Sequence, residues 1–302
     1  MVVGGANMDV LARSNALMAA ETSNPGRTVF TPGGVGRNLA ENLARWGVPV
    51  RLVTRVGADA LGRELLTKTE AAGVDISLVN PVQGAVTGTY VAVIAHTGDL
   101  VVAVSDMGIT EAIAPVDIDQ AASALAEAQL VLADANLLPA TLGRLLDVCA
   151  ETNVPVIVEP VSVPKAARLS GVLWPARPIH TLTPNLAELQ AMTGVSDPFA
   201  AAQLLRERGV QRVWCHHGSG STIYNAYGAQ SVRVETVEAV DVTGAGDALV
   251  AGYVAALLRR VSVAEAVRFG HLAAELTVQS AQTVRSDLAA LCPLPSDPFE
   301  PV

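Results

Sequence analysis

Apolar and polar positions follow a regular rhythm from residue 129 onward. Short apolar runs predict strands at residues 129–134, 154–159 and 181–183, and the segment between the first two, residues 139–151, has helical spacing. The same alternation predicts helices at residues 188–192, 200–208, 245–260 and 263–280, and strands at residues 212–216 and 222–227. Apolar strands separated by helices are typical of βαβ units, in which a mostly parallel sheet is covered on both faces. The pattern therefore predicts an α/β fold.

The first hundred residues have a less regular pattern that is richer in strands. Strands are predicted at residues 2–3, 10–20, 28–31 and 50–56, and helices at residues 39–46 and 59–72. Residues 89–95 and 100–105 flank a polar turn, which predicts a hairpin. These two strands are apolar on both faces, and a two-stranded ribbon cannot bury both faces alone. We therefore expect the hairpin to pack as part of a lid or against a second subunit.

Composition and charge narrow the class of protein. The chain has 302 residues, half of them hydrophobic and 16% charged, which is enough apolar material for a large core. The net charge of −9 argues against nucleic acid or an anionic membrane as the main partner. The first residues have neither a basic start nor an apolar core, and no apolar run approaches the roughly 20 residues of a membrane span. Three cysteines, Cys149, Cys215 and Cys292, are far apart and lack metal spacing, so we expect a cytoplasmic protein.

Candidate chemistry concentrates in the run from Asp241 to Asp247. Gly244, Ala245 and Gly246 are small and directly precede an apolar helix, so their N–H groups would form an anion site at a helix N-terminus. A carboxylate beside such a site, here Asp247, suits a base for transfer of a phosphoryl group to a hydroxyl. The alternative is a glycine-rich turn in which Asp247 is only the helix N-cap. The run alone favours neither interpretation.

Four further polar clusters lie at the ends of predicted strands, at residues 4–9, 33–38, 183–188 and 217–221. Each has a purely structural alternative: the pair Asn185 and Glu188, for example, could be a helix capping box. In their order and context the five clusters resemble the ribokinase-like, or PfkB, family of sugar and nucleoside kinases, and the resemblance covers nearly the whole chain. Within the family the sequence is similar to the pseudouridine kinase subfamily, in residues 23–26, 30–38, 106–107, 153–156, 160–162, 179–182 and 267–269.

The resemblance implies a single ribokinase-like kinase domain over residues 1–302. Its expected fold is a three-layer α/β/α sandwich with a mostly parallel central sheet and a small β-sheet lid, whose strands are inserted at about residues 10–31 and 86–106. The implied activity is ATP-dependent phosphorylation of the 5′-hydroxyl of pseudouridine. The alternatives are another sugar or nucleoside kinase of the family, such as a ribokinase or an adenosine, inosine or cytidine kinase, and a nucleoside-binding regulator without catalysis. The implied partners are the nucleoside, ATP and a second copy of the chain bound through the lid.

Carried over by position, the resemblance also implies roles for individual residues. Asp247 would take the proton of the acceptor hydroxyl, and the amides of residues 244–246 would hold the transferring phosphoryl group. Asn185 and Glu188 would order Mg²⁺ and the phosphates, Glu188 through a metal-bound water. Asp241 would help to hold a monovalent cation such as K⁺. The other implied residues are Asn7, Asp9, Gly33, Gly34, Arg37, Asn38, Thr89 and Asp106 for the acceptor, and His216, Gly218, Gly220 and Thr243 for the nucleotide.

Three positions depart from the family pattern, and the double histidine His216-His217 is also unusual in the nucleotide loop. Ser221 stands where the nucleotide loop usually has its second glycine, so Gly220 is expected to provide the close backbone approach instead. Glu159 stands where relatives generally have Asp. Asp106 stands where Asn is expected in the lid.

Overall fold

The computed structural model describes residues 1–217, 220–234 and 237–296. Its main sheet has eight strands in the order β14-β13-β12-β11-β10-β9-β1-β4. The six strands β12, β11, β10, β9, β1 and β4 run parallel to one another. Strand β13 is antiparallel to β12, and β14 is antiparallel to β13. The bounds are β1 Val2–Val3, β4 Leu52–Val53, β9 Val131–Asp134, β10 Val156–Glu159, β11 Thr181–Leu182, β12 Val213–His217, β13 Gly220–Asn225 and β14 Gly228–Arg233.

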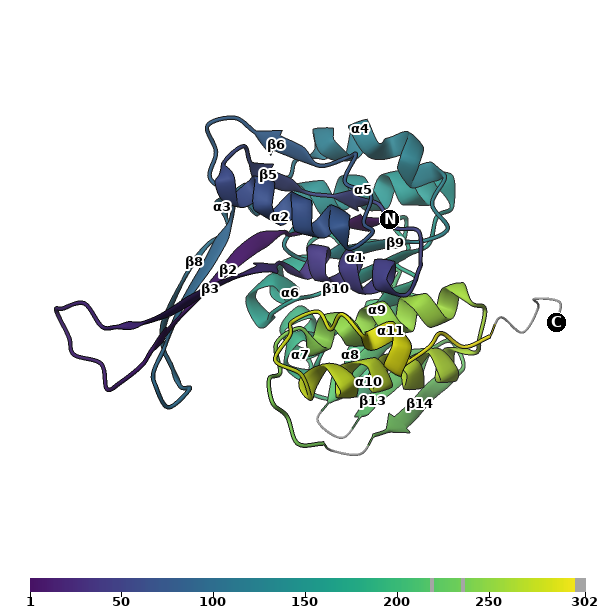
Figure 1. The fold of residues 1–302 in the computed structure, drawn as a ribbon. Coiled ribbons are helices and arrows are strands. Elements are labelled where there is room, and N and C mark those ends of the chain that lie inside the picture. The colour runs from purple at the N-terminus through teal and green to yellow at the C-terminus, as the bar shows by residue number, and fades with distance from the viewer. Residues whose placement is uncertain (218–219, 235–236, 297–302) are drawn as a thin grey trace.

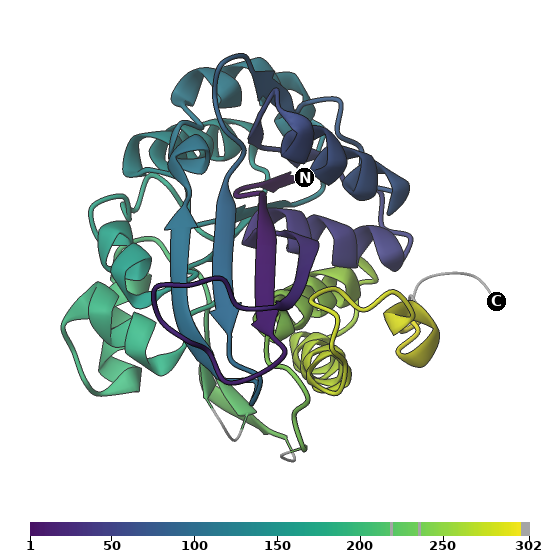
Figure 2. The same cartoon turned by 60° about the vertical axis from the view of Figure 1, so that its left-hand side comes forward.

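Helices cover both faces of this sheet, as Figures 1 and 2 show. Alternate residues of one strand enter different cores: Val131 and Ala133 belong to one hydrophobic cluster, whereas Leu132 belongs to the other. This period-two division explains why the strands read as continuous apolar runs, and it confirms the predicted three-layer arrangement. The helices are α1 Val35–Arg45, α2 Ala60–Ala71, α3 Gly108–Glu111, α4 Pro115–Ala126, α5 Pro139–Thr152, α6 Val163–Leu169, α7 Leu186–Thr193, α8 Pro198–Glu207, α9 Ala245–Leu258, α10 Val263–Val278 and α11 Leu288–Leu291.

A second sheet of four strands projects from this body (Figure 1). It has the order β3-β2-β7-β8 and consists of β2 Asn7–Ser14, β3 Gly26–Gly33, β7 Thr89–Ile94 and β8 Leu100–Asp106. We call this sheet the lid. Its strands lie close to the predicted segments, although the strand predicted at residues 10–20 begins at Asn7 and ends at Ser14. A short parallel pair, β5 Arg55–Gly57 and β6 Asn80–Val82, lies beside it.

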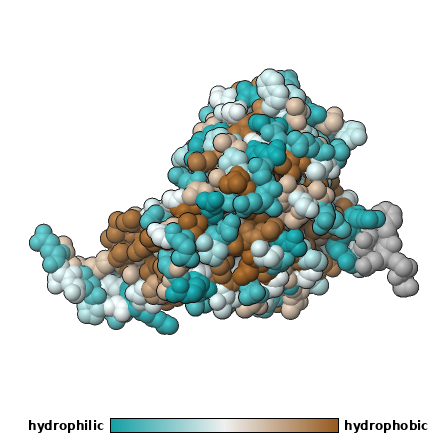
Figure 3. All heavy atoms as spheres, turned by 90° about the horizontal axis from the view of Figure 1, so that it is seen from above, coloured by the Kyte–Doolittle hydropathy of each residue, from teal (hydrophilic) through white to brown (hydrophobic). Residues whose placement is uncertain are grey.

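One face of the lid is apolar and uncovered by the rest of the chain. The strand register aligns Phe30, Val10, Val91 and Val104 in one row across all four strands. Phe30 is 50% exposed and Val104 is 65% exposed. Figure 3 shows the corresponding brown surface on the lid. Within the described residues, no helix combines the length and apolarity needed to cross a bilayer.

One local prediction was wrong in a way that matters for the site. Helix α1 begins at Val35, not at residue 39, so Arg37 and Asn38 lie in its first turn. The start is possible because Gly34 has φ 94°, and a Cβ at Gly34 would lie 2.6 Å from the Cα of Ala6. Helix α1 therefore begins in close contact with the loop between β1 and β2.

Candidate active site

The N-terminus of α9 forms the centre of the candidate site. Gly244 is its N-cap, with φ 79°, and a Cβ there would lie 2.0 Å from the carbonyl oxygen of Thr283. Only glycine fits this conformation and this contact. Asp247 is consequently the third residue of the helix, and its interpretation as an N-cap is wrong. The N–H of Ala245 donates to the carbonyl of Val242 at 3.3 Å, whereas helix geometry leaves the next N–H groups without an intrahelical acceptor.

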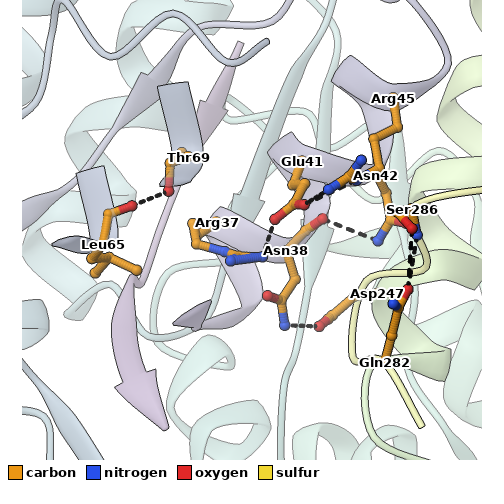
Figure 4. A network of polar contacts seen from close by, with 10 residues as sticks. All are labelled: Arg37, Asn38, Glu41, Asn42, Arg45, Leu65, Thr69, Asp247, Gln282 and Ser286. Carbon is orange, nitrogen blue, oxygen red and sulfur yellow. Dashed lines mark hydrogen bonds and ion pairs between the residues drawn. The ribbon is translucent and has the colours of Figure 1, made fainter. Parts of the chain in front are cut away.

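Asp247 receives a hydrogen bond from a residue far away in the sequence. The Asn38 Nδ2 donates to Asp247 Oδ2 over 2.7 Å (Figure 4). Burial raises the pKa of Asp247 to about 7, while the Asn38 hydrogen bond and the charge of Arg37 act in the opposite direction. A carboxylate that ionises near neutral pH is well matched to general-base chemistry at that pH.

Arg37, which the sequence suggested as an acceptor ligand, lies within a buried ionic network. It is 2% exposed and forms an ion pair with Glu41, which also accepts from Arg45 Nε over 2.9 Å (Figure 4). The positive charge of Arg37 lowers the pKa of Asp9 and of Asp247, although burial raises both more strongly. In this structure Arg37 is therefore held by its ion pair with Glu41, and its charge adds positive electrostatic potential to the site.

Three of the residues expected to bind the acceptor lie at the base of the lid. Asn7 Nδ2 donates to Asp9 Oδ1 over 2.7 Å, and the Asp9 carboxylate lies over Gly33, where a Cβ would be 2.4 Å from its Oδ2. Asp9 is close enough to Asp247 to raise its pKa, and the charge of Arg37 acts on both carboxylates. The structure thus brings Asn7, Asp9 and Gly33 together with Asn38 and Asp247.

The structure does not bring Thr89 and Asp106 onto that face. Thr89 pairs with Met8 on one side and with Asp106 on the other, so all three side chains share the face opposite to Asn7 and Asp9. The row that includes Asp9 instead contains Tyr90 and Ser105. Sequence reasoning missed these two residues because the shared face depends on the register between strands.

Four of the residues expected to bind the nucleotide line a cavity of about 400 Å³. Asn185, Glu188, His216 and Gly220 line it together with Ala245 and Gly246 of α9. The Nε2 of His216 is buried and has no hydrogen-bond partner among the described residues. Thr243 is exposed, and its N–H donates to Asp241 Oδ1 over 2.8 Å. Gly218 lies outside the described residues.

Asn185 and Glu188 form the capping box that was the structural alternative for this pair. The Glu188 N–H donates to Asn185 Oδ1 and the Asn185 N–H donates to Glu188 Oε2, each over 2.9 Å. Glu188 still lines the cavity, and burial raises its pKa. A single carboxylate suits Mg²⁺ that arrives with nucleotide phosphates and retains water. It does not suit an all-protein metal cage, and the described residues contain no cluster of three or more metal-ligating side chains.

Two further acids lie at the carboxyl ends of neighbouring parallel strands. Asp134, which ends β9, is fully buried and accepts from the Gly5 N–H over 2.8 Å. Glu159, which ends β10, accepts a hydrogen bond from the hydroxyl of Thr183, and burial raises its pKa to about 8. The sequence contained a signal for these two acids, because both follow apolar runs of strand length and ligands of open α/β sheets bind at the carboxyl ends of strands.

Comparison with known proteins agrees with this geometry. A model described as pfkB family carbohydrate kinase matches residues 1–290. The chain is 33% identical over 296 residues to pseudouridine kinase of Escherichia coli (strain K12), covering 96% of this chain and 93% of that protein. It is 29% identical over 293 residues to ribokinase of Bacillus subtilis (strain 168), covering 92% of each.

Solved structures confirm the predicted fold. A carbohydrate kinase from Agrobacterium tumefaciens superposes with a TM-score of 0.83 at 30% identity, covering 96% of this chain and 95% of that chain. Arabidopsis thaliana ribokinase complexed with ribose and ATP superposes with a TM-score of 0.81 at 24% identity, covering 97% and 98%.

Proposed function

The chain belongs to the PfkB family of carbohydrate kinases, and we propose that it transfers the γ-phosphoryl group of ATP to the 5′-hydroxyl of pseudouridine. The enzyme is a phosphotransferase that acts on an alcohol group. The observation that carries the proposed chemistry is the hydrogen bond of Asn38 to Asp247 beside the α9 N-terminus. Pseudouridine is proposed as the acceptor because of the similarity to the Escherichia coli pseudouridine kinase along nearly the whole chain.

In the proposed mechanism, Asp247 accepts the proton of the 5′-hydroxyl as the hydroxyl oxygen attacks the γ-phosphorus, while the bond from the γ-phosphorus to the β–γ bridging oxygen breaks and ADP leaves. The N–H groups of the first turn of α9 face the negative charge that develops on the phosphoryl oxygens. Asn185 and Glu188 position the phosphates, and Mg²⁺, when bound with them, neutralises part of their charge. Most of the rate acceleration then comes from positioning and electrostatic stabilisation, as expected for phosphoryl transfer.

The lid supplies the acceptor side. Asn7 and Asp9 hold the ribose hydroxyls, and Tyr90 and Ser105, which share their face, contact the base. Closure of this face over the acceptor excludes water and limits hydrolysis of ATP.

We also propose that the opposite, apolar face of the lid pairs with the lid of a second copy. The row of Phe30, Val10, Val91 and Val104 is apolar and partly exposed in the monomer, and a two-fold axis would bury it against the same row of a second copy. Light scattering at micromolar concentration should give the mass of a dimer, and Val104→Glu should reduce it to that of a monomer. A wild-type monomer would refute the pairing.

The activity test measures Mg²⁺-dependent ADP formation with pseudouridine, uridine, cytidine, adenosine, inosine and ribose, for the wild type and Asp247→Asn. We expect selective turnover of pseudouridine that is lost in the variant. Preference for another acceptor would retain the kinase mechanism and discard the proposed substrate. Absence of turnover with every acceptor would refute the proposed function and favour a nucleoside-binding regulator.

A further inference from the structure

One wall of the nucleotide cavity contains a chain of hydrogen bonds that the proposed mechanism does not use. Trp214 of β12 places its Nε1 2.8 Å from the Oγ of Ser221 in β13. The same Oγ lies 2.8 Å from the Nε2 of His271 in α10. Trp214 and Ser221 are fully buried, whereas His271 lines the cavity. This chain of hydrogen bonds thus connects the core to the cavity wall.

The chemistry of the three groups fixes the direction of each hydrogen bond. An indole N–H can only donate, so Ser221 Oγ accepts from Trp214. Ser221 is fully buried, so its own hydroxyl proton needs an acceptor, and within the described residues the partner of its Oγ besides Trp214 is the Nε2 of His271. Nε2 therefore accepts this proton. Burial lowers the pKa of His271 to about 4, so this ring is neutral at pH 7 and carries one proton. That proton therefore resides on Nδ1.

Trp214, at which the chain of hydrogen bonds starts, is held rigidly. The Trp214 ring stacks on His216 with centroids 4.9 Å apart and contacts Tyr253 at 4.5 Å. A Cβ at Gly270 of α10 would lie 3.3 Å from the Trp214 ring, so the helix that carries His271 packs closely on the indole. These contacts prevent Trp214 from turning its N–H away from Ser221.

This arrangement gives a physical reason for serine at position 221, where the family pattern usually has a glycine. Gly220 has φ 133°, and a Cβ there would lie 2.1 Å from the carbonyl oxygen of Val232. Gly220 therefore makes a close backbone contact with β14, and its expected approach to the nucleotide stays a prediction. The next position, Ser221, is free to carry a side chain that points into the core toward Trp214 and His271.

We propose that Ser221 is a positioning residue for nucleotide binding: it holds His271 as the Nδ1–H tautomer, so that the imidazole donates a hydrogen bond to a ring nitrogen of a purine nucleotide. The inference rests on the proposed use of ATP. The phosphates lie at the α9 end of the cavity, so the base lies toward His271 and Ala274 of α10, which line its wall. A neutral donor and an apolar neighbour suit a flat purine ring with nitrogen acceptors.

Two measurements without any acceptor test this inference. NMR of protein labelled with ¹⁵N-histidine, assigned with His271→Gln, should show His271 protonated at Nδ1. Isothermal titration should show that Ser221→Ala raises the Kd of ADP about three- to tenfold, the range expected for one hydrogen bond. The kcat at saturating ATP should change less than twofold, because the base does not take part in phosphoryl transfer. Thr222→Ala is the matched control, since its hydroxyl bonds Ser231 instead.

Each other outcome overturns the inference. Protonation of His271 at Nε2 in the wild type would remove its basis, even if Ser221→Ala failed to fold. Unchanged ADP binding by a folded Ser221→Ala would do the same while leaving the proposed kinase activity intact. A wild-type protein that binds no adenine nucleotide would overturn both the inference and the proposed function.

Discussion

Asn38→Leu tests whether the hydrogen bond seen in the structure controls the ionisation of the proposed base. In the wild type, Asn38 donates to the Asp247 carboxylate and stabilises its charged form, while burial holds its pKa at about 7. Leucine is close in size but cannot donate. The neutral carboxylic acid therefore becomes relatively more stable in the variant, and the pKa of Asp247 rises.

The size of this shift follows from the strength of one hydrogen bond. A hydrogen bond to a charged group contributes about 1.5–3 kcal/mol, which corresponds to about 1–2 pKa units at 1.36 kcal/mol per unit. The pKa of Asp247 would then be about 8–9 in the variant. At pH 7 the ionised fraction falls from about one half to about 1–10%, so the rate falls about five- to fiftyfold through ionisation alone.

The assay is the pH dependence of kcat/KM for the acceptor between pH 5.5 and 9, at saturating MgATP. Activity should rise with pH through the pKa of the base, because only the carboxylate accepts a proton. In Asn38→Leu the rise should move upward by about 1–2 pH units. Asn42→Leu is the matched control: Asn42 is buried one turn further along α1 and donates to the Asn38 carbonyl, with no hydrogen bond to Asp247.

A lower rate with an unshifted pH profile would refute the reasoning. It would mean that Asn38 acts on binding of the acceptor, with no control over the proton affinity of Asp247. An equal shift in Asn42→Leu would also refute it, because the effect would then come from the helix as a whole.

Four further variants test other parts of the site. Gly244→Ala should lower stability by about 2 kcal/mol or more and abolish activity, because its Cβ meets backbone, whereas Gly246→Ala should fold normally and lose only activity. Thermal unfolding and ADP formation distinguish the two, and equal stabilities would contradict the argument. Glu41→Gln should lower the free energy of unfolding by about 3 kcal/mol in urea titrations, because Arg37 would remain buried without its carboxylate partner; an unchanged urea midpoint would contradict this. Glu159→Gln should flatten the pH dependence of stability. A folded-state pKa of about 8 against a usual 4.5 means that the wild type loses stability as the pH rises from 4.5 to 8, by about a few kcal/mol, and a parallel decline in the variant would exclude Glu159 as the cause.

The sequence alone determined the layers of the fold and the centre of the site. Apolar runs at strand length, separated by helical spacing, require burial on two faces, and the structure has two cores that share most strands of the main sheet. Small residues before an apolar helix at residues 241–247 require a tight turn with free N–H groups. Both features are local, so a linear pattern is sufficient to predict them.

Tertiary structure alone decided which side chains meet. Asn38 and Asp247 are 209 positions apart, and their contact depends on how α1 and α9 pack on the same face of the sheet. Thr89 and Asp106 were expected to bind the acceptor, but Tyr90 and Ser105 are the residues of β7 and β8 that share the face of Asp9, because a shift of one residue in register reverses every side chain of a strand. Spacing along the chain determines each element, whereas contacts between elements depend on registers and close approaches that no single segment encodes.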